Sequence, residues 1–145
     1  MQTNIHPDLI ALPKVQEADA ILRKCVHCGF CTATCPTYQL LGDELDGPRG
    51  RIYLIKNLLE ENTISDDSIV HLDRCLTCRA CETTCPSGVE YGRLLDIGRE
   101  FVQDHANRSL RSRLLTFALR LVVPRPLLFA PLLKLGQFFR PLLPA

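Results

Sequence analysis

All eight cysteines of this sequence lie in two copies of one spacing. The first copy, CVHCGFCTATCP, begins at Cys25, and the second, CLTCRACETTCP, begins at Cys75, 50 residues later. Each copy reads Cys-x-x-Cys-x-x-Cys-x-x-x-Cys-Pro. Three thiolates at i, i+3 and i+6 wrap a loop around a compact inorganic core. This run, closed by a cysteine before proline, is typical of chains that bind [4Fe–4S] clusters.

The fourth cysteine of each run is set apart from the other three and stands directly before a proline. In two-cluster proteins with this run, a helix that starts near the proline carries the fourth cysteine away, and it ligates the other cluster. We therefore predict two [4Fe–4S] clusters with crossed ligand sets, which tie the two halves of the chain together. The first set is Cys25, Cys28, Cys31 and Cys85, and the second is Cys75, Cys78, Cys81 and Cys35.

Other cysteine chemistry fits the spacing less well. Structural zinc takes paired CxxC units, so a third cysteine at i+6 fits zinc poorly, and zinc stays as the weaker alternative. Covalent haem needs a histidine after CxxC, where Gly29 and Arg79 stand here, so haem attachment is excluded. A CxxC dithiol would leave six cysteines unexplained.

The two runs differ between their ligands. Gly29 corresponds to Arg79, and Phe30 corresponds to Ala80. Charge, hydrogen bonding and exposure set the potential of an iron–sulfur cluster. We therefore predict two distinct reduction potentials.

Three polar residues near the first run have two interpretations each. His27 could donate a hydrogen bond to sulfur, but we favour the interpretation in which His27 only fills the loop and faces solvent. Arg49 and Arg51 follow Cys35 near a predicted helix start. They are either cations that favour the reduced state of an anionic cluster or part of a solvated helix face.

The segments that position the runs have helical periodicity, and no segment shows convincing strand alternation. Helices are predicted over residues 15–24, after Pro48, over 65–74 and over 88–105. Pro48 suits a first helical turn with Asp46 or Gly47 at the cap, and Ser65 suits the next cap. The predicted fold class is therefore mainly α. The residues expected to pack are Val15, Ala18, Ile21, Leu22, Ile52, Ile55, Leu58, Leu59, Leu94, Leu95, Ile97, Phe101 and Val102.

The charge changes at about Ser109. Residues 1–108 hold 11 Lys/Arg against 16 Asp/Glu, whereas residues 109–145 hold six Lys/Arg and no acid. We expect an N-terminal extension over 1–14, a ferredoxin domain over 15–108, and a basic apolar tail over 109–145. The tail is expected to dock on a further domain or a partner, with peripheral membrane contact as the second choice.

The tail is not expected to cross a membrane. Its longest uncharged run, residues 126–133, has eight residues, far below the roughly 20 that a span needs. Residues 109–123 are amphipathic and basic. The prolines beyond them are expected to break any long helix. They are Pro124, Pro126, Pro131, Pro141 and Pro144.

The beginning of the sequence, MQTNIHPDLIALPKVQEADAILRK, lacks the basic and then apolar pattern of a secretory signal. A secreted disulfide scaffold would also be shorter and richer in cysteine. We therefore expect reduced thiolates in the cytoplasm, with peripheral contact at the inner face of the cell membrane as a further expectation.

The 39 residues between Cys35 and Cys75 form a longer segment than compact βαβ ferredoxins have. The spacing resembles the α-helical ferredoxin domain of fumarate reductase, heterodisulfide reductase and anaerobic glycerol-3-phosphate dehydrogenase subunits. Most of residues 18–145 resemble the iron–sulfur subunit of bacterial glycolate oxidase. YQLLGDELDGPRGRIYLIK is the most family-specific stretch, and LVVPRPLLFAPLLKLGQFFRPLLP is similar to the segment after the ferredoxin module.

That resemblance implies an electron-transfer role. FAD-binding partner subunits would oxidise glycolate to glyoxylate, and this chain would carry electrons onward toward a quinone. Its own cofactors would be the two clusters. The family continues into two CCG-type cysteine-rich domains that these 145 residues do not include, so acceptor-side chemistry is not assigned to them.

The chain has no catalytic constellation of its own that we can identify. GDELDGPRG has glycines but lacks the GxGxxG and Walker patterns. The alternative function is an iron–sulfur module of another complex, of the lactate-utilisation, heterodisulfide-reductase or anaerobic glycerol-3-phosphate dehydrogenase type. The apolar tail argues against a free carrier, and the acidic residues of 1–108 argue against nucleic acid.

Overall fold

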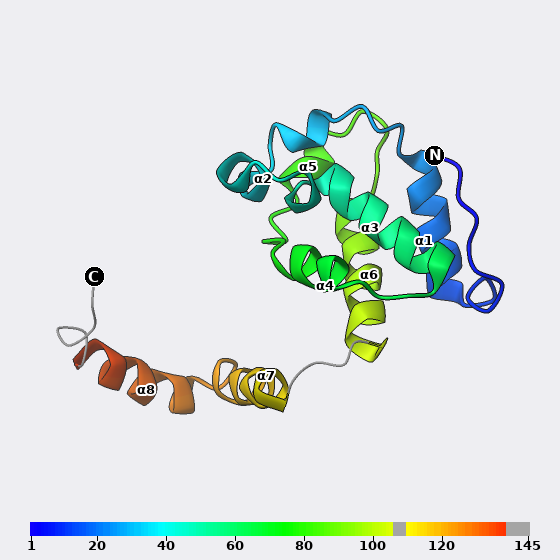
Figure 1. Cartoon of the computed structure of the whole chain (residues 1–145). Helices are drawn as coiled ribbons and strands as arrows, with labels where there is room; N and C mark the ends of the chain where they lie inside the picture. Colours follow the sequence, from blue (N-terminus) through cyan, green and yellow to red (C-terminus); the bar gives the residue numbers. More distant parts are fainter. Residues whose placement is uncertain (106–109, 139–145) are drawn as a thin grey trace. The chain divides into compact units, whose positions relative to one another are not determined.

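The computed structural model describes residues 1–105 and 110–138. Within these ranges the regular elements are all helices, which confirms the predicted mainly α class (Figure 1). The chain divides into two units, Met1–Ala106 and Asn107–Ala145, which are described separately. The elements, with η for 3-10 helices, are α1 (Pro13–Lys24), η1 (Phe30–Thr32), α2 (Pro36–Leu41), η2 (Glu44–Asp46), α3 (Pro48–Glu61), α4 (Asp66–Asp73), α5 (Ala80–Thr83), α6 (Tyr91–His105), α7 (Leu110–Val122) and α8 (Pro126–Phe138).

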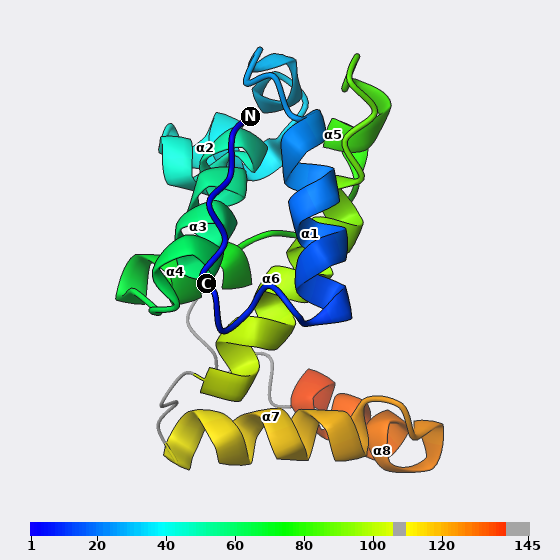
Figure 2. The ribbon, with the colours of Figure 1, turned by 90° about the vertical axis from the view of Figure 1, so that its right-hand side faces the viewer.

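The core of the first unit forms where α1, α3 and α6 pack together, with α4 against α3 and α6 (Figure 2). Every residue predicted to pack on these helices is buried. The N-terminal segment also lies on this core, because Leu9 is buried and the His6 amide donates to the Leu59 carbonyl. Burial of each large aliphatic side chain contributes about 1.5–3 kcal/mol.

The predicted helix starts at Pro48 and Ser65 are confirmed. Pro48 occupies the first turn of α3 with Gly47 at the cap, and the Ser65 side chain accepts from the Ser68 amide. A Cβ added at Gly50 would lie 2.1 Å from the Glu44 carbonyl oxygen. Glycine therefore allows η2 to lie directly on α3.

The two cysteine runs gather at one end of the helical core, the upper end in Figure 2, where η1 contacts α5. Their backbones turn alike. The third residue of each run is left-handed, with φ of 55° at His27 and 57° at Thr77. The fifth is left-handed too, with φ of 82° at Gly29 and 58° at Arg79. The repeated spacing thus produces a repeated loop conformation.

The chain leaves the two runs differently. Cys35 is the N-cap of α2, which begins at Pro36, as predicted. After Cys85 the expected helix does not start at the proline. A turn with φ of 59° at Gly88 comes first, and α6 begins at Tyr91. The expectation of a helix start near the proline is therefore wrong for the second run.

The second unit contains α7 and α8. The expectation that proline would break this segment is confirmed between Val122 and Pro126, where α7 ends and α8 begins. It is wrong at Pro131, which lies inside the 13-residue α8. Pro141 and Pro144 lie outside the described residues. No single helix in residues 1–105 and 110–138 is long and apolar enough to cross a bilayer. One pair, Arg113–Val122 with Pro126–Phe138, meets that length and composition together, but it bends by 109°.

Candidate metal centres

The first pocket at the cysteine end contains all four cysteines of the first predicted ligand set. It lies between the 25–31 loop, the start of α3, and the 85–91 segment. Cys85, from the second run, therefore lies with three cysteines of the first run, as the crossed assignment requires. The cysteines that line this pocket are Cys25, Cys28, Cys31, Cys81 and Cys85.

A second pocket contains the other predicted set. It is lined by the residues around Cys35, by the 75–81 loop, and by Arg51 and Tyr91. Cys81 lines both pockets, so the two sites adjoin at this residue. The cysteines that line this pocket are Cys35, Cys75, Cys78 and Cys81.

The thiols in both pockets influence one another electrostatically. Burial, and then the neighbouring charge at Cys25, raises the pKa of the Cys31 thiol, with smaller contributions from Cys28 and Cys85. Burial also raises the pKa of Cys81 to about 12, with contributions from Cys31, Cys75 and Cys35. Thiolates gathered at this density repel one another. They therefore need bound cations, which the irons of a cluster would supply.

Arg99 of α6 fastens the backbone at the start of the second run. Its guanidinium donates to the carbonyl oxygens of Leu72, Asp73 and Cys75, at 2.6 to 3.3 Å, and to the Thr77 hydroxyl at 3.0 Å. One side chain thus satisfies the end of α4 and holds the loop that carries Cys75 and Cys78. The sequence alone did not predict this role, because the carbonyls lie more than 20 residues away along the chain.

Met1 contacts the corresponding carbonyls of the first run. Its amino group donates to the Arg23 carbonyl at 3.2 Å and to the Cys25 carbonyl at 2.8 Å. Its Sδ lies 3.1 Å from Nε2 of His27. The ring of His27 packs against Tyr53, with centroids 4.5 Å apart, and desolvation by burial lowers the pKa of His27. His27 is therefore partly buried, and these ring contacts are to Met1 and Tyr53 rather than to a cysteine sulfur.

The two arginines on α3 have different surroundings. Arg51 has no exposed surface and donates to the His71 carbonyl at 2.7 Å, to the Thr37 hydroxyl at 3.1 Å and to the Asp46 carboxylate at 3.2 Å. Arg49 is 38% exposed and pairs with Glu44. A solvated helix face therefore describes Arg49 and is wrong for Arg51.

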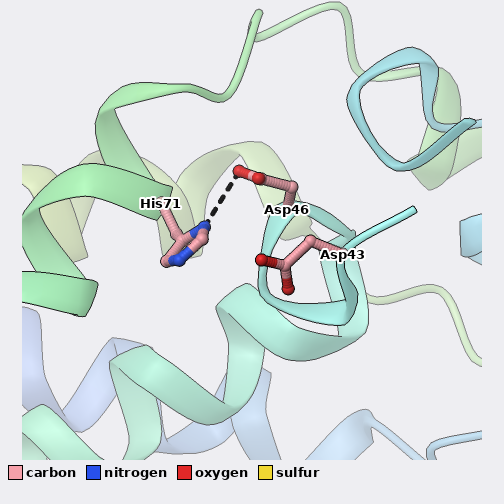
Figure 3. Close-up of side chains that lie close together, drawn as sticks. All are labelled: Asp43, Asp46 and His71. Atoms are coloured by element: carbon pink, nitrogen blue, oxygen red, sulfur yellow. Dashed lines mark ion pairs between the residues drawn. The ribbon is translucent and has the colours of Figure 1, made fainter. Parts of the chain in front are cut away.

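Asp46 is the centre of this buried charge network. It pairs with Arg51 and Arg74, and its Oδ1 lies 3.0 Å from Nδ1 of His71, a short contact that is poorly aligned for a hydrogen bond (Figure 3). Burial alone would raise the pKa of Asp46. The partners His71 and Arg74 outweigh burial and hold that pKa below its usual value.

Asp43, Asp46 and His71 lie close enough to hold a metal ion (Figure 3). The charges favour another interpretation. Arg51 and Arg74 already neutralise Asp46, and the Asp43 carboxylate accepts from the Leu45 amide. Two guanidinium groups beside the same carboxylate would repel a divalent cation. This cluster is therefore a structural ion-pair network behind the second pocket.

Four polar groups contact cysteine sulfur in the described residues, one of them the Asp46 carbonyl oxygen, 3.7 Å from Cys35 Sγ. The Tyr91 hydroxyl donates to Cys75 Sγ at 3.6 Å, and the Thr37 hydroxyl lies 3.2 Å from Cys35 Sγ. The Val89 amide donates to Cys85 Sγ at 3.5 Å. The side-chain hydroxyls therefore lie at the second pocket, and a backbone amide lies at the first.

Comparison with known proteins agrees with this chemistry. Residues 21–89 match the family described as 4Fe-4S dicluster domain. These residues are similar to domains that hold two 4Fe-4S clusters. The full chain is 61% identical over 144 residues to the glycolate oxidase iron-sulfur subunit of Escherichia coli (strain K12), which covers 99% of this chain and 35% of that protein. Over nearly its whole length, the chain is similar to this glycolate oxidase iron-sulfur subunit.

Further relatives extend the comparison. The probable glycolate oxidase iron-sulfur subunit of Bacillus subtilis (strain 168) is 43% identical over 65% of this chain and 22% of its own length. The succinate dehydrogenase iron-sulfur subunit of Paracoccus denitrificans is 31% identical over 47% of this chain and 29% of its own length. The chain thus spans about a third or less of these relatives. No solved structure matches.

The residues at this end fit [4Fe–4S] clusters. All eight cysteines are free thiols, and each predicted set of four lines one pocket. The two left-handed residues in each run bend the backbone around these thiols. Thiolates are the ligands that iron–sulfur clusters take from proteins.

Proposed function

We propose that this chain is the electron-transfer iron–sulfur subunit of a flavin-dependent glycolate oxidase. In this proposal it holds two [4Fe–4S] clusters, one on Cys25, Cys28, Cys31 and Cys85, and the other on Cys75, Cys78, Cys81 and Cys35. The observation that carries the proposal is the crossed grouping. The first pocket contains three cysteines of the first run with Cys85 and the shared Cys81, and the second contains three cysteines of the second run with Cys35. Paired four-thiolate sites are the form that two-cluster ferredoxins take.

The substrate assignment depends on the relatives. Identity is 61% to a protein named as a glycolate oxidase subunit and 31% to one named as a succinate dehydrogenase subunit, so glycolate is favoured. The resemblance implies that FAD-binding partner subunits oxidise glycolate to glyoxylate and release two electrons per substrate. When bound, the clusters accept and donate single electrons. The final acceptor in this proposal is a quinone.

The chain's own residues supply the support for the clusters. The thiolates hold the irons, and the left-handed loop residues and Arg99 hold the thiolates in place. Cys28 and Cys78 are exposed, whereas Cys25, Cys35 and Cys81 are buried. Each site therefore reaches the surface at one ligand, where a redox partner can approach.

The second unit supplies features that fit a partner surface. Apolar side chains such as Leu110, Phe117 and Leu127 are exposed on α7 and α8, and residues 109–145 carry cations without acids. In this proposal the tail docks on the FAD-binding subunits or on a further domain. The proposed location is the cytoplasm, with peripheral contact at the inner face of the membrane, where basic residues meet anionic lipid.

The test uses protein purified without oxygen together with the FAD-binding subunits. We expect iron and sulfide at the content of two [4Fe–4S] clusters, and EPR signals that appear when glycolate is added. Lactate at equal concentration is the substrate control. Cys28→Ser and Cys78→Ser chains are the ligand controls. Full glycolate-dependent quinone reduction without this chain would refute the proposal.

The role of the tail is tested separately. A chain that ends after residue 108 should keep its iron and lose co-purification with the FAD-binding subunits, because its exposed apolar helices are gone. Loss of both clusters in this shorter chain would instead show that the tail supports the ferredoxin domain.

A further inference from the structure

The two cluster sites are not electrostatically equal. Both consist of cysteine thiolates, so their ligands alone would give them similar potentials. Charge, burial and hydrogen bonds to sulfur remain as the factors that can separate them. Each of these factors differs between the two pockets.

Thr37 is the first residue that distinguishes the second site. Its hydroxyl lies 3.2 Å from Cys35 Sγ and 2.7 Å from the Asp46 carbonyl oxygen. A hydroxyl has one hydrogen and two lone pairs. Because Arg51 donates to the Thr37 hydroxyl oxygen, the single hydroxyl hydrogen can bond to either the Asp46 carbonyl oxygen or the Cys35 sulfur. At 2.7 Å the Thr37 hydroxyl donates to the Asp46 carbonyl oxygen. A Cys35 thiolate bound to iron would have no hydrogen of its own, so Thr37 would be the one group of the Thr37–Cys35 pair that can donate.

Arg51 strengthens this contact. A guanidinium that donates to a hydroxyl oxygen polarises its O–H bond, and hydrogen bonds in such chains reinforce one another. Arg51 has no exposed surface, so water does not screen its charge. Its partner Asp46 is shared with Arg74, and the exposed Asp43 carboxylate lies in the same cluster.

Tyr91 adds a second donor, on another ligand of the same site. Its hydroxyl donates to Cys75 Sγ at 3.6 Å, and its side chain is only 4% exposed. A phenolic hydroxyl carries a proton at neutral pH and can donate it to a thiolate that only accepts. It remains a donor whatever the oxidation state of the site.

The first site has weaker counterparts. Its sulfur contact among the described residues comes from the Val89 amide at 3.5 Å on Cys85. Its nearest arginine, Arg49, is partly exposed and neutralised by Glu44. A cation that water screens stabilises added negative charge less than a buried cation does.

We infer that Thr37, Arg51 and Tyr91 raise the reduction potential of the site around Cys35 and Cys75 above that of the site around Cys25 and Cys85. Donors to sulfur and unscreened positive charge stabilise the reduced, more negative state. An electron shared by the two sites then resides at the second. This inference rests on the proposed pair of clusters and deepens that proposal, because it states which of the two has the higher reduction potential.

The test is an EPR-monitored redox titration of the iron-loaded chain. Thr37→Val removes the hydroxyl at nearly constant volume, Thr37→Ser keeps the hydroxyl, and Tyr91→Phe removes the second donor. We expect Thr37→Val and Tyr91→Phe each to lower the higher midpoint potential and to leave the lower one unchanged, and the double variant to shift the higher one further. Thr37→Ser should keep the original value, which a purely structural role for Thr37 would not predict.

Ligand variants assign the signals. Cys28 lines only the first pocket and Cys78 only the second, so Cys28→Ser and Cys78→Ser each alter one signal. If the higher potential belongs to the signal altered by Cys28→Ser, or if Thr37→Val and Tyr91→Phe shift neither potential, the inference is overturned. Absence of two cluster signals from the unmodified chain would instead refute the proposed function.

Discussion

The two cysteine runs have the same local structure and different tertiary surroundings. Both are left-handed at their third and fifth residues. In both, a nitrogen donates hydrogen bonds to backbone carbonyls at equivalent positions. In the first run the Met1 amino group donates to Arg23 and Cys25. In the second the Arg99 guanidinium donates to Asp73 and Cys75. The donors themselves come from unrelated parts of the chain. A short motif can therefore specify the shape of a loop, while the rest of the fold decides what surrounds it.

The surroundings separate the runs further. The second run lies in front of a buried network, formed by Asp46, Arg51 and His71. The first run lies beside a partly exposed ion pair, formed by Arg49 and Glu44. Removing one partner of a buried pair leaves an uncompensated charge, whereas an exposed pair contributes little. Mutations at matched positions should therefore have unequal effects.

The largest effect is expected from replacing Cys35 or Cys85, the fourth cysteine of each run. Cys35→Ser should damage the site of Cys75, Cys78 and Cys81, and Cys85→Ser should damage the site of the first run, with loss of about half of the iron in each case. Iron analysis and EPR measure the outcome. If Cys35→Ser selectively removed the signal that Cys28→Ser also removes, the crossed assignment would be wrong.

A smaller effect is expected at the charge networks. Asp46→Asn should destabilise the first unit by about 3–5 kcal/mol, because Arg51 is left buried without its counterion. Glu44→Gln at the exposed pair should cost less than about 1 kcal/mol. Thermal unfolding without oxygen compares the two variants. Equal losses would contradict the contrast between the networks.

The loss of stability in Asp46→Asn should depend on pH. The folded pKa of Asp46 is below its usual value, so its contribution is fully present above the unfolded pKa, near 4, and is lost as the pH falls through the folded pKa. The stability difference between the wild type and Asp46→Asn should therefore stay constant from pH 7 to about 4 and narrow below. A difference that narrowed already between pH 7 and 5 would contradict the lowered pKa.

Arg99→Gln should have an intermediate effect that is confined to the second run. Loss of the donor removes the side-chain hydrogen bonds to the carbonyls of Leu72 and Cys75, at a cost of about 1–3 kcal/mol. Hydrogen exchange should rise in residues 75–78 and stay unchanged in residues 25–28. Arg93 lies on the same helix as Arg99, and Arg93→Gln, which removes only its exposed ion pair with Glu17 of α1, is the control. A uniform rise in both runs would mean that Arg99 supports the whole core.

The smallest effect is expected at the fifth residue of each run. Arg79→Gly should relieve left-handed strain and stabilise the chain by up to about 1 kcal/mol. Gly29→Ala should destabilise it by about 1 kcal/mol, because its Cβ also lies 3.2 Å from the Arg49 guanidinium. Unfolding midpoints measure both. The same sign for both variants would show that the two loops are not equivalent at this position.

Much of the fold was predictable from short-range patterns. The apolar faces of α1, α3 and α6 follow from helical periodicity, and the starts of α3 and α4 follow from Pro48 and Ser65. Pro131 shows where such rules fail. A proline is unfavourable inside a helix, yet α8 continues through it, because a local penalty is only one contribution to the stability of a segment.

The candidate site divides in the same way. The cysteine spacing by itself predicted thiolate ligands in two equivalent runs, because the spacing within each run is local and the run occurs twice. The crossed grouping was predicted from the rule for two-cluster proteins with this run. Only the tertiary structure decided that Arg51 is buried beside Cys35, that His27 packs on Tyr53, and that Arg99 holds the second run. Burial and hydrogen-bond partners depend on segments distant in sequence, and a single sequence carries no signal for which of its polar residues will meet.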